Sequence, residues 1–345
     1  MSGADATTTA ELAEAVVSGE RRAIARAITL VESTRDDDEE RAQALLATLH
    51  AHTGRALRVG VTGTPGVGKS TFLEALGTHL LALGHRVAVL AVDPSSTRTG
   101  GSILGDKTRM EELARDPRAF IRPSPSQGAL GGVARKTREA SLVLEAAGYD
   151  VVLIETVGTG QSEVAVADMV DTFVLLVAPG GGDELQGVKR GVLEVTDVLV
   201  VNKADGAMRD AAVRTAGEYT MGLSFSHHAL AGYTVPVVLC SAQERTGVDA
   251  VWSAIGAHRA ALLRDARLEE KRAHQRERAL WSVVDDALMR AFTKHPKVRA
   301  RLDEETARVR AGDEPPARAA RTLVRAFLDE EGEATGMSRE RQEIP

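Results

Sequence analysis

The feature that most constrains the fold of this chain is the octapeptide at residues 63–70, Gly-Thr-Pro-Gly-Val-Gly-Lys-Ser. It matches the phosphate-binding pattern G-x-x-x-x-G-K-[ST]. Residues 58–62 before it carry two valines and a threonine and predict a strand, and residues 71–83 after it predict a helix. A strand, a glycine-rich loop and a helix in this order aim the helix N-terminus at phosphate groups. The motif therefore predicts a nucleotide-binding α/β fold.

The residues of this loop have separate roles in such a site. Glycines allow backbone N–H groups to face phosphate oxygens, Lys69 supplies a positive charge to the β- and γ-phosphates, and the Ser70 hydroxyl is a ligand for Mg²⁺. We therefore expect a nucleoside triphosphate to be held by Gly63, Thr64, Pro65, Gly66, Val67, Gly68, Lys69 and Ser70.

The hydrophobic pattern divides the chain into three regions. Residues 1–54 and 263–345 carry apolar residues at helical spacing, whereas residues 55–262 alternate β-branched runs with helical segments. Such alternation predicts a mostly parallel sheet with helices on both faces. We expect a P-loop domain between an N-terminal and a C-terminal helical region. Strands are predicted at 57–62, 86–92, 118–122, 150–156, 171–178, 196–202 and 235–240, and flanking helices at 10–17, 21–31, 39–50 and 317–328.

A second motif indicates which base is bound. Asn202-Lys203-Ala204-Asp205 ends a predicted strand and matches N-K-x-D. The Asp205 carboxylate is able to accept hydrogen bonds from both N1–H and the 2-amino group of guanine, a donor pair that adenine lacks. Asn202 is expected to reach the base edge or to brace the phosphate loop, and the stem of Lys203 to cover the base plane. The predicted ligand is therefore GTP, with GDP as its product.

The last predicted strand leads to the segment Cys240-Ser241-Ala242. Its place in the pattern predicts that its backbone contacts guanine O6. We interpret Cys240 as positional rather than nucleophilic.

Two further strand ends carry carboxylates. Asp93 and Glu155 each end a predicted strand, where side chains of a parallel sheet face the ligand crevice. Mg²⁺ prefers oxygen ligands, so Ser70, Asp93 and Glu155 are predicted metal ligands, directly or through water. Glu155 stands where most such proteins have the Asp of a D-x-x-G switch, and Gln161 lies three residues beyond Gly158 rather than beside it. This displacement predicts slow hydrolysis without a partner.

Two glycine-rich loops lie between the predicted strands. In residues 97–109, Asp106 is a predicted metal residue, and Lys107 or Arg109 is placed to stabilise negative charge in the transition state. The predicted catalytic residues are thus Lys69, Asp106, Arg109 and Glu155. The loop at 180–189 begins with three consecutive glycines, which are followed by both acidic and basic residues. We expect it to be a nucleotide-responsive surface for a partner.

Bulk composition excludes several classes of protein. The net charge of −6 does not match the basic surface of a nucleic-acid-binding protein. A single cysteine excludes an intrachain disulfide framework and a C-x-x-C metal site. No apolar run approaches the roughly 18 residues of a membrane span, and the N-terminus lacks the features of a secretory signal. A cytoplasmic protein that binds neither nucleic acid nor membrane is expected.

Together these motifs resemble one family. The segments GTPGVGKST, VDPSS, GGSILGDKTRM, ETVGTGQSE, APGGGDELQG and NKAD are similar to those of the methylmalonyl-CoA mutase-associated GTPases, the MeaB/ArgK group. The resemblance covers roughly residues 10–330. It implies a homodimer that uses GTP hydrolysis to gate adenosylcobalamin delivery to methylmalonyl-CoA mutase and to protect that enzyme. It also implies a phosphate and magnesium site made by Lys69, Ser70, Thr71, Asp93, Asp106 and Glu155.

The same resemblance bears on the two remaining segments. It implies that the loop at 180–189 is a switch that communicates with the mutase. An apolar stripe between charged positions runs from Leu280 to Ala291, and its pattern alone fits either packing on the nucleotide domain or pairing with a second subunit. The resemblance favours pairing, and so predicts a dimerisation arm.

Three other functions compete with this prediction. An older label for the same family is a kinase of amino-acid transport binding proteins, but Asp205 argues against ATP. A nickel-delivery GTPase would need thiol or imidazole clusters, whereas Cys240 is the only cysteine and His227-His228 the only adjacent pair among nine histidines. A GTP-dependent scaffold without catalysis is the third.

Overall fold

The computed structural model of the chain describes residues 8–93, 110–125, 130–156, 162–180, 190–224, 230, 232–264 and 266–328. Contacts divide the chain into two compact units, one ending at Glu277 and one beginning at Arg278. The first unit contains the sheet, and the second contains the end of one long helix and two further helices. The three-region division at 54/55 and 262/263 stays a prediction.

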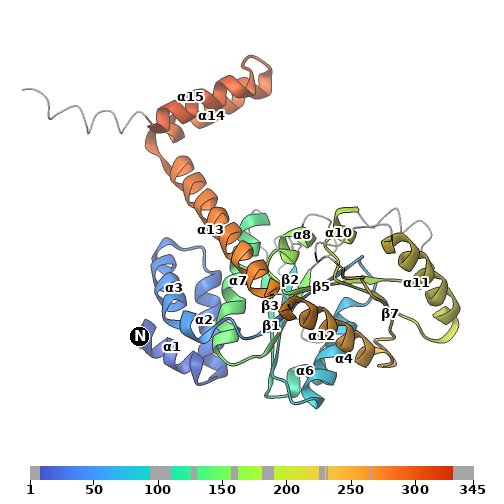
Figure 1. The fold of residues 1–345 in the computed structure, drawn as a ribbon. Coiled ribbons are helices and arrows are strands. Elements are labelled where there is room, and N and C mark those ends of the chain that lie inside the picture. The colour runs from blue at the N-terminus through green and yellow to red at the C-terminus, as the bar shows by residue number, and fades with distance from the viewer. Residues whose placement is uncertain are drawn as a thin grey trace, which may run out of the picture. The chain divides into compact units, whose positions relative to one another are not determined.

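Seven parallel strands form one sheet in the order β3-β2-β4-β1-β5-β6-β7. Figure 1 shows this sheet with helices packed around it. β1 lies in the middle, between β4 and β5, so the predicted phosphate loop leaves the centre of the sheet. Every predicted strand is confirmed, with ends that differ by a few residues at most. The strands are β1 Leu57–Gly63, β2 Val87–Asp93, β3 Ala119–Pro125, β4 Val151–Thr156, β5 Thr172–Val177, β6 Val198–Val201 and β7 Val237–Leu239.

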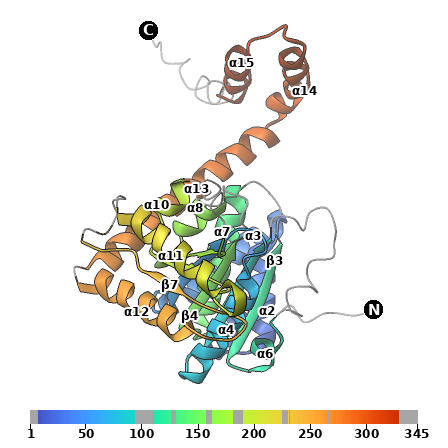
Figure 2. The same cartoon turned by 90° about the vertical axis from the view of Figure 1, so that its right-hand side faces the viewer.

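Helices cover both faces of the sheet (Figure 2). One face packs against α4 (Lys69–Ala82), α6 (Glu111–Arg115) and α12 (Val248–Arg264). The other packs against α7 Leu130–Ala146, α8 Ser162–Ala167, α10 Arg190–Glu194 and α11 Arg209–Ser224. Short 3₁₀ turns lie at His50–His52 and Gly206–Met208. Because both faces are buried, the central strands are almost continuously apolar, and all six residues of β5 are buried.

Three N-terminal helices pack on one another and on α7. They are α1 (Thr9–Val17), α2 (Arg21–Glu32) and α3 (Asp36–Leu49), as the sequence predicts. α1 begins with a capping box, in which Thr8 and Glu11 satisfy each other's backbone N–H groups. α2 buries the helically spaced set Ala23, Ile24, Ala27, Ile28 and Val31.

The described part of the second unit consists of helices joined by short turns. α13 (Arg267–Lys294) begins in the first unit and ends in the second, where α14 (Pro296–Ala311) packs on α15 (Pro316–Leu328). α14 starts with a proline at its first turn and ends at Gly312, whose φ of 82° allows the left-handed cap. Large apolar side chains are nevertheless exposed on the part of α13 in this unit: Leu280, Trp281, Leu288 and Met289. Across the described ranges, no helix has both the length and the apolar character that a membrane span requires.

Candidate functional site

Glycines shape the loop at the end of β1. Gly63 has a φ of 152°, and a side chain there would collide with the carbonyl oxygen of Leu176 on β5. Gly68 has a φ of 94°, and a Cβ at this position would lie 2.9 Å from Asn202 Nδ2. Both positions therefore exclude larger residues, as close approach of backbone to a phosphate requires. α4 begins directly after Gly68, so its N-terminal N–H groups lie at the loop.

The charged and hydroxyl groups of the predicted triphosphate site lie together. The Lys69 ammonium donates hydrogen bonds to the carbonyl oxygens of Gly63 at 2.8 Å and Thr64 at 3.3 Å. The Ser70 hydroxyl donates to Glu155 Oε1 at 3.3 Å. Glu155 reaches this place because its strand pairs with β1, in register with Val61. A cation, a hydroxyl and a carboxylate thus converge at the carboxyl edge of the sheet.

Asn202 braces the phosphate loop against the last loop of the predicted base site. Its side chain is 2% exposed. Nδ2 donates to the carbonyl oxygen of Val67 at 2.9 Å, and Oδ1 accepts from the N–H of Ala242 at 3.1 Å. The next residue, Lys203, has a φ of 57° and donates from Nζ to the carbonyl oxygen of Gly66 at 2.7 Å. Two consecutive side chains therefore tie the N-K-x-D segment to the phosphate loop.

The loop after β7 positions the Asp205 carboxylate. The Ser241 hydroxyl donates a hydrogen bond to Asp205 Oδ2 and accepts one from the N–H of Glu244 at 3.1 Å. Gly247, with a φ of 75°, closes this loop where a side chain would strike the Leu239 carbonyl. The carboxylate is thereby held at a fixed orientation, as recognition of a donor pair requires.

Cys240 is buried within the same loop, with 1% of its surface exposed. Burial, with a smaller effect of the Asp249 charge, raises the pKa of the thiol to about 12. The thiol is therefore protonated at neutral pH, which suits a packing role and opposes nucleophilic chemistry.

Several predicted residues fall outside the described part of the chain. Asp106, Lys107, Arg109, Gly158, Gln161, His227, His228 and residues 181–189 lie there. For Asp93 the backbone ends β2 and pairs with Pro125, while its side chain is not described. Within the ranges that the structure describes, no group of three or more His, Cys, Asp or Glu residues is arranged to hold a metal ion.

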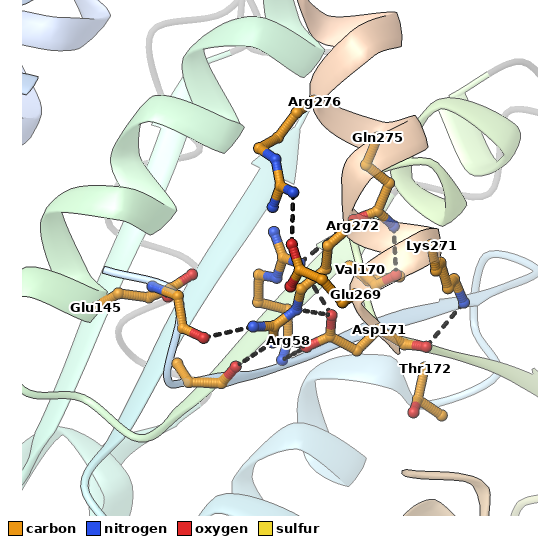
Figure 3. Close-up of polar contacts among 12 residues, drawn as sticks. Arg58, Glu145, Val170, Asp171, Thr172, Glu269, Lys271, Arg272, Gln275 and Arg276 are labelled. Atoms are coloured by element: carbon orange, nitrogen blue, oxygen red, sulfur yellow. Dashed lines mark hydrogen bonds and ion pairs between the residues drawn. The ribbon is translucent and has the colours of Figure 1, made fainter. Parts of the chain in front are cut away.

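A buried ionic cluster at the opposite edge of the sheet was not predicted. Figure 3 shows Arg58 of β1, Asp171 before β5 and Arg272 of α13 pointing toward one another. Arg272 makes a two-pronged contact with the Asp171 carboxylate at 2.9 and 2.7 Å, and Arg58 Nη2 donates to it at 2.9 Å. Arg272 also donates to the carbonyl oxygens of Gly54 and Ala56. The cluster therefore fastens the start of α13 to the chain that enters β1.

The charge of Asp171 is retained in spite of its burial. Its side chain is 1% exposed. Burial alone would raise the pKa of this carboxyl, but hydrogen bonds from Arg272 and the charges of Arg58 and Arg272 lower it to about 2. Glu145, nearby on α7, behaves in the opposite way, since burial raises its pKa. The one sequence signal for this cluster is an arginine in an otherwise uncharged strand.

A buried threonine, histidine and aspartate lie beside this cluster. Thr172 Oγ1 is 2.9 Å from His258 Nδ1, and His258 Nε2 is 3.2 Å from Asp197 Oδ1. Such an order of groups resembles a nucleophilic triad. Thr172 and His258 are both 0% exposed, however, so no substrate reaches them. The arrangement ties β5 and β6 to α12.

A family model and several known proteins are similar to this chain over most of its length. The family model described as "Methylmalonyl Co-A mutase-associated GTPase MeaB" matches residues 24–297. A probable GTPase of Mycobacterium tuberculosis is 54% identical over 313 residues, which cover 91% of this chain and 93% of that protein. The Mus musculus protein named methylmalonic aciduria type A homolog, mitochondrial, is 45% identical over 322 residues, which cover 90% of this chain and 78% of that protein.

A solved structure agrees over nearly the whole chain. The crystal structure of an LAO/AO transport system kinase aligns with a TM-score of 0.74 at 36% identity, covering 94% of this chain and 98% of that one. The α/β fold of this chain is therefore shared with a solved protein.

Proposed function

We propose that this chain, which belongs to the MeaB family of methylmalonyl-CoA mutase-associated GTPases, binds and hydrolyses GTP to gate adenosylcobalamin delivery to a methylmalonyl-CoA mutase and to protect that enzyme. The observation that carries the nucleotide part is the Asn202 brace. It joins the phosphate loop at Val67 to the base loop at Ala242, so phosphate and base sites form one rigid frame. Asp205, oriented by Ser241, supplies the guanine-specific acceptor.

Magnesium fits the oxygen donors at the phosphate end of this frame. Ser70 Oγ and Glu155 Oε1 lie 3.3 Å apart, and both are hard ligands of the kind that Mg²⁺ selects. Ser70 and Glu155 would hold the ion, with Thr71 beside them and Asp93 and Asp106 as further predicted ligands. When bound, the ion would neutralise charge on the β- and γ-phosphates.

The chain's own residues supply the remaining chemistry in this proposal. Lys69 withdraws charge from the γ-phosphate, and Arg109 is proposed to assist it. Glu155 orients water at the site. Hydrolysis is slow until a partner acts, because Gln161 lies three residues beyond Gly158 in the sequence rather than beside it. Measured turnover of tens per second by the purified protein alone would contradict this part.

Nucleotide competition tests the proposal. We expect unlabelled GTP to displace a fluorescent guanine nucleotide at least ~100-fold more effectively than ATP, because adenine offers Asp205 no donor pair and leaves a carboxylate unsatisfied. GDP should compete as GTP does, and phosphate release should follow GTP addition. Preferred binding of ATP would instead support the transport-kinase function named for the solved relative.

A nickel-delivery function has less support. It requires a cluster of thiols or imidazoles, and the described residues contain no such group. The single cysteine is buried in the base loop.

The partner surfaces are proposed on chemical grounds. Leu280, Trp281, Leu288 and Met289 of α13 are between 57% and 62% exposed, and a second copy of the chain would cover such apolar area. The loop at 180–189 is proposed to contact the mutase. A cytoplasmic location stays a prediction.

Light scattering on a sizing column tests both partners in one experiment. The purified protein is expected to elute with the mass of two chains, and Trp281→Asp should shift it toward one chain. With mutase added, a GTP analogue and GDP should give different amounts of complex. A monomeric wild-type protein would contradict the predicted role of the C-terminal helices as a dimerisation arm. A mutase that binds equally in all nucleotide states, or not at all, would contradict the gating function.

A further inference from the structure

Two buried threonines meet beneath the carboxyl edge of the sheet, outside the roles assigned above. Thr156 Oγ1 donates a hydrogen bond to Thr62 Oγ1 at 2.8 Å. Their side chains are 0% and 1% exposed, respectively. Thr62 directly precedes Gly63 of the phosphate loop, and Thr156 directly follows Glu155. The pair therefore joins the two strands that lead into the triphosphate site.

The backbone pairing of β1 with β4 stops just short of this contact. Its last registered pair is Val61 with Glu155. Thr62 pairs through its backbone with Leu175 of β5, on the other side of β1. The hydroxyl bond from Thr156 thus continues the contact between β1 and β4 for one residue beyond their ladder. It is made at the last residue of β4 and one residue before the end of β1.

The threonine pair and the Glu155 carboxylate lie on opposite faces of the sheet, because side chains alternate along a strand. Glu155 faces α4, where its Oε1 accepts from Ser70. The pair faces the layer of α7 and α8, which is apolar: a Cβ on neighbouring Gly60 would touch Phe173 and Val166. Replacing both partners of a buried hydrogen bond by apolar groups of the same shape is nearly neutral for stability. Stability alone therefore gives little reason for hydroxyls at this place.

We propose that Thr156 is a positioning residue for GTP hydrolysis. Thr156 pairs through its backbone with Val92 of β2. Its side-chain bond to Thr62 also ties this strand end to β1, so that the Glu155 carboxylate, on the other face of the sheet, stays within reach of Ser70. This inference rests on the proposed function, because it assigns a role within the same triphosphate site. Displacement of a reacting group by about 1 Å lowers a rate by up to ~100-fold, and the 3.3 Å contact of Glu155 leaves little room for such a shift.

A set of valine and serine substitutions tests the role. Thr156→Val keeps the shape and removes the donor, and we expect kcat for GTP to fall about 10-fold while KM and GDP affinity change by less than about twofold. Thr156→Ser keeps the hydroxyl and should retain most of kcat. Each single valine variant leaves one buried hydroxyl without its partner and should lower Tm by roughly 3 °C.

The double variant T62V/T156V separates the effect on the position of Glu155 from the effect on the stability of the fold. It removes both hydroxyls, so we expect Tm to return close to the wild-type value while kcat stays low. Thr196→Val is the matched control: Thr196 is also 0% exposed, but its hydroxyl donates to the Val192 carbonyl at 2.7 Å, within its own segment. This control should lower Tm and leave kcat unchanged.

The outcomes distinguish this inference from the function on which it rests. Wild-type kcat in Thr156→Val, or recovery of kcat together with Tm in the double variant, would overturn the positioning role and leave a GTPase intact. A wild-type protein that neither binds nor hydrolyses GTP would overturn both.

Discussion

Asp205→Asn is expected to lower the affinity for GTP and GDP by at least ~100-fold and to create affinity for xanthine nucleotides. The carboxylate offers two charge-assisted acceptors to guanine N1–H and the 2-amino group, and each such bond contributes about 1.5–3 kcal/mol. An asparagine keeps one acceptor and presents a donor, which opposes the 2-amino group but matches the 2-oxo group of xanthine. A change from GTP to XTP would follow from one atom exchanged in the side chain.

Competition binding with GTP, XTP and ATP measures this change. Because Ser241 is able to donate to the amide oxygen as it does to the carboxylate, the loop should keep its shape and the Tm should change little. Asp210→Asn is the matched control, since Asp210 is an exposed acid in the first turn of α11; it should leave all three affinities unchanged. Equal loss of GTP and XTP binding would mean that Asp205 supports the loop and does not read the base.

Asp171→Asn is expected to lower the free energy of unfolding by about 3–5 kcal/mol, because it leaves two buried guanidinium groups without their carboxylate. The exposed fractions of Arg58 and Arg272 are only 13% and 10%. Denaturant unfolding measures the loss. Glu269→Gln, on the helix that carries Arg272, is the matched control: the ion pair of Glu269 with Arg276 is exposed, and such pairs contribute at most about 1 kcal/mol. Equal effects of the two variants would show that the cluster contributes no special stability.

The same pair of proteins has a characteristic pH dependence. The pKa of Asp171 is about 2 in the folded chain against 3.8 for the free group, so its charge is held more tightly after folding. The contribution of Asp171 to the free energy of unfolding is complete above its pKa in the unfolded chain. This contribution is lost as the pH falls from about 4 through 2. The stability difference between wild type and Asp171→Asn should therefore shrink by about 2 kcal/mol over that interval. Glu145, whose raised pKa acts in the opposite direction, is present in both proteins.

The sheet was predictable from sequence because its strands are short β-branched runs, and the segments between them carry apolar residues at helical spacing. β5 is buried along its whole length, and its sequence shows this directly as Thr-Phe-Val-Leu-Leu-Val. The strand order was not predicted, since β2 and β4 pair across the intervening β3 and α7. Local patterns do not encode which strands become neighbours.

The site was predictable to the extent that its residues lie within short motifs. The phosphate loop and the N-K-x-D segment each carry their chemistry in a few consecutive residues. Asn202 was expected either to reach the base or to brace the phosphate loop, and the structure shows the brace. The ionic cluster was missed because its partners are far apart in the chain: Arg272 and Gly54 are separated by 218 residues. A lone arginine on a charged helix carries no sign of such a partner.

The buried Cys240 thiol provides a natural probe for opening of the base loop. With the thiol enclosed and its pKa near 12, a thiol reagent in neutral buffer reacts only during moments when the loop opens. The rate of that reaction therefore measures how often the base loop opens, and no label has to be introduced. Since the chain has one cysteine, the signal has a single origin. A nucleotide that holds the loop closed should lower the rate at which the reagent modifies Cys240.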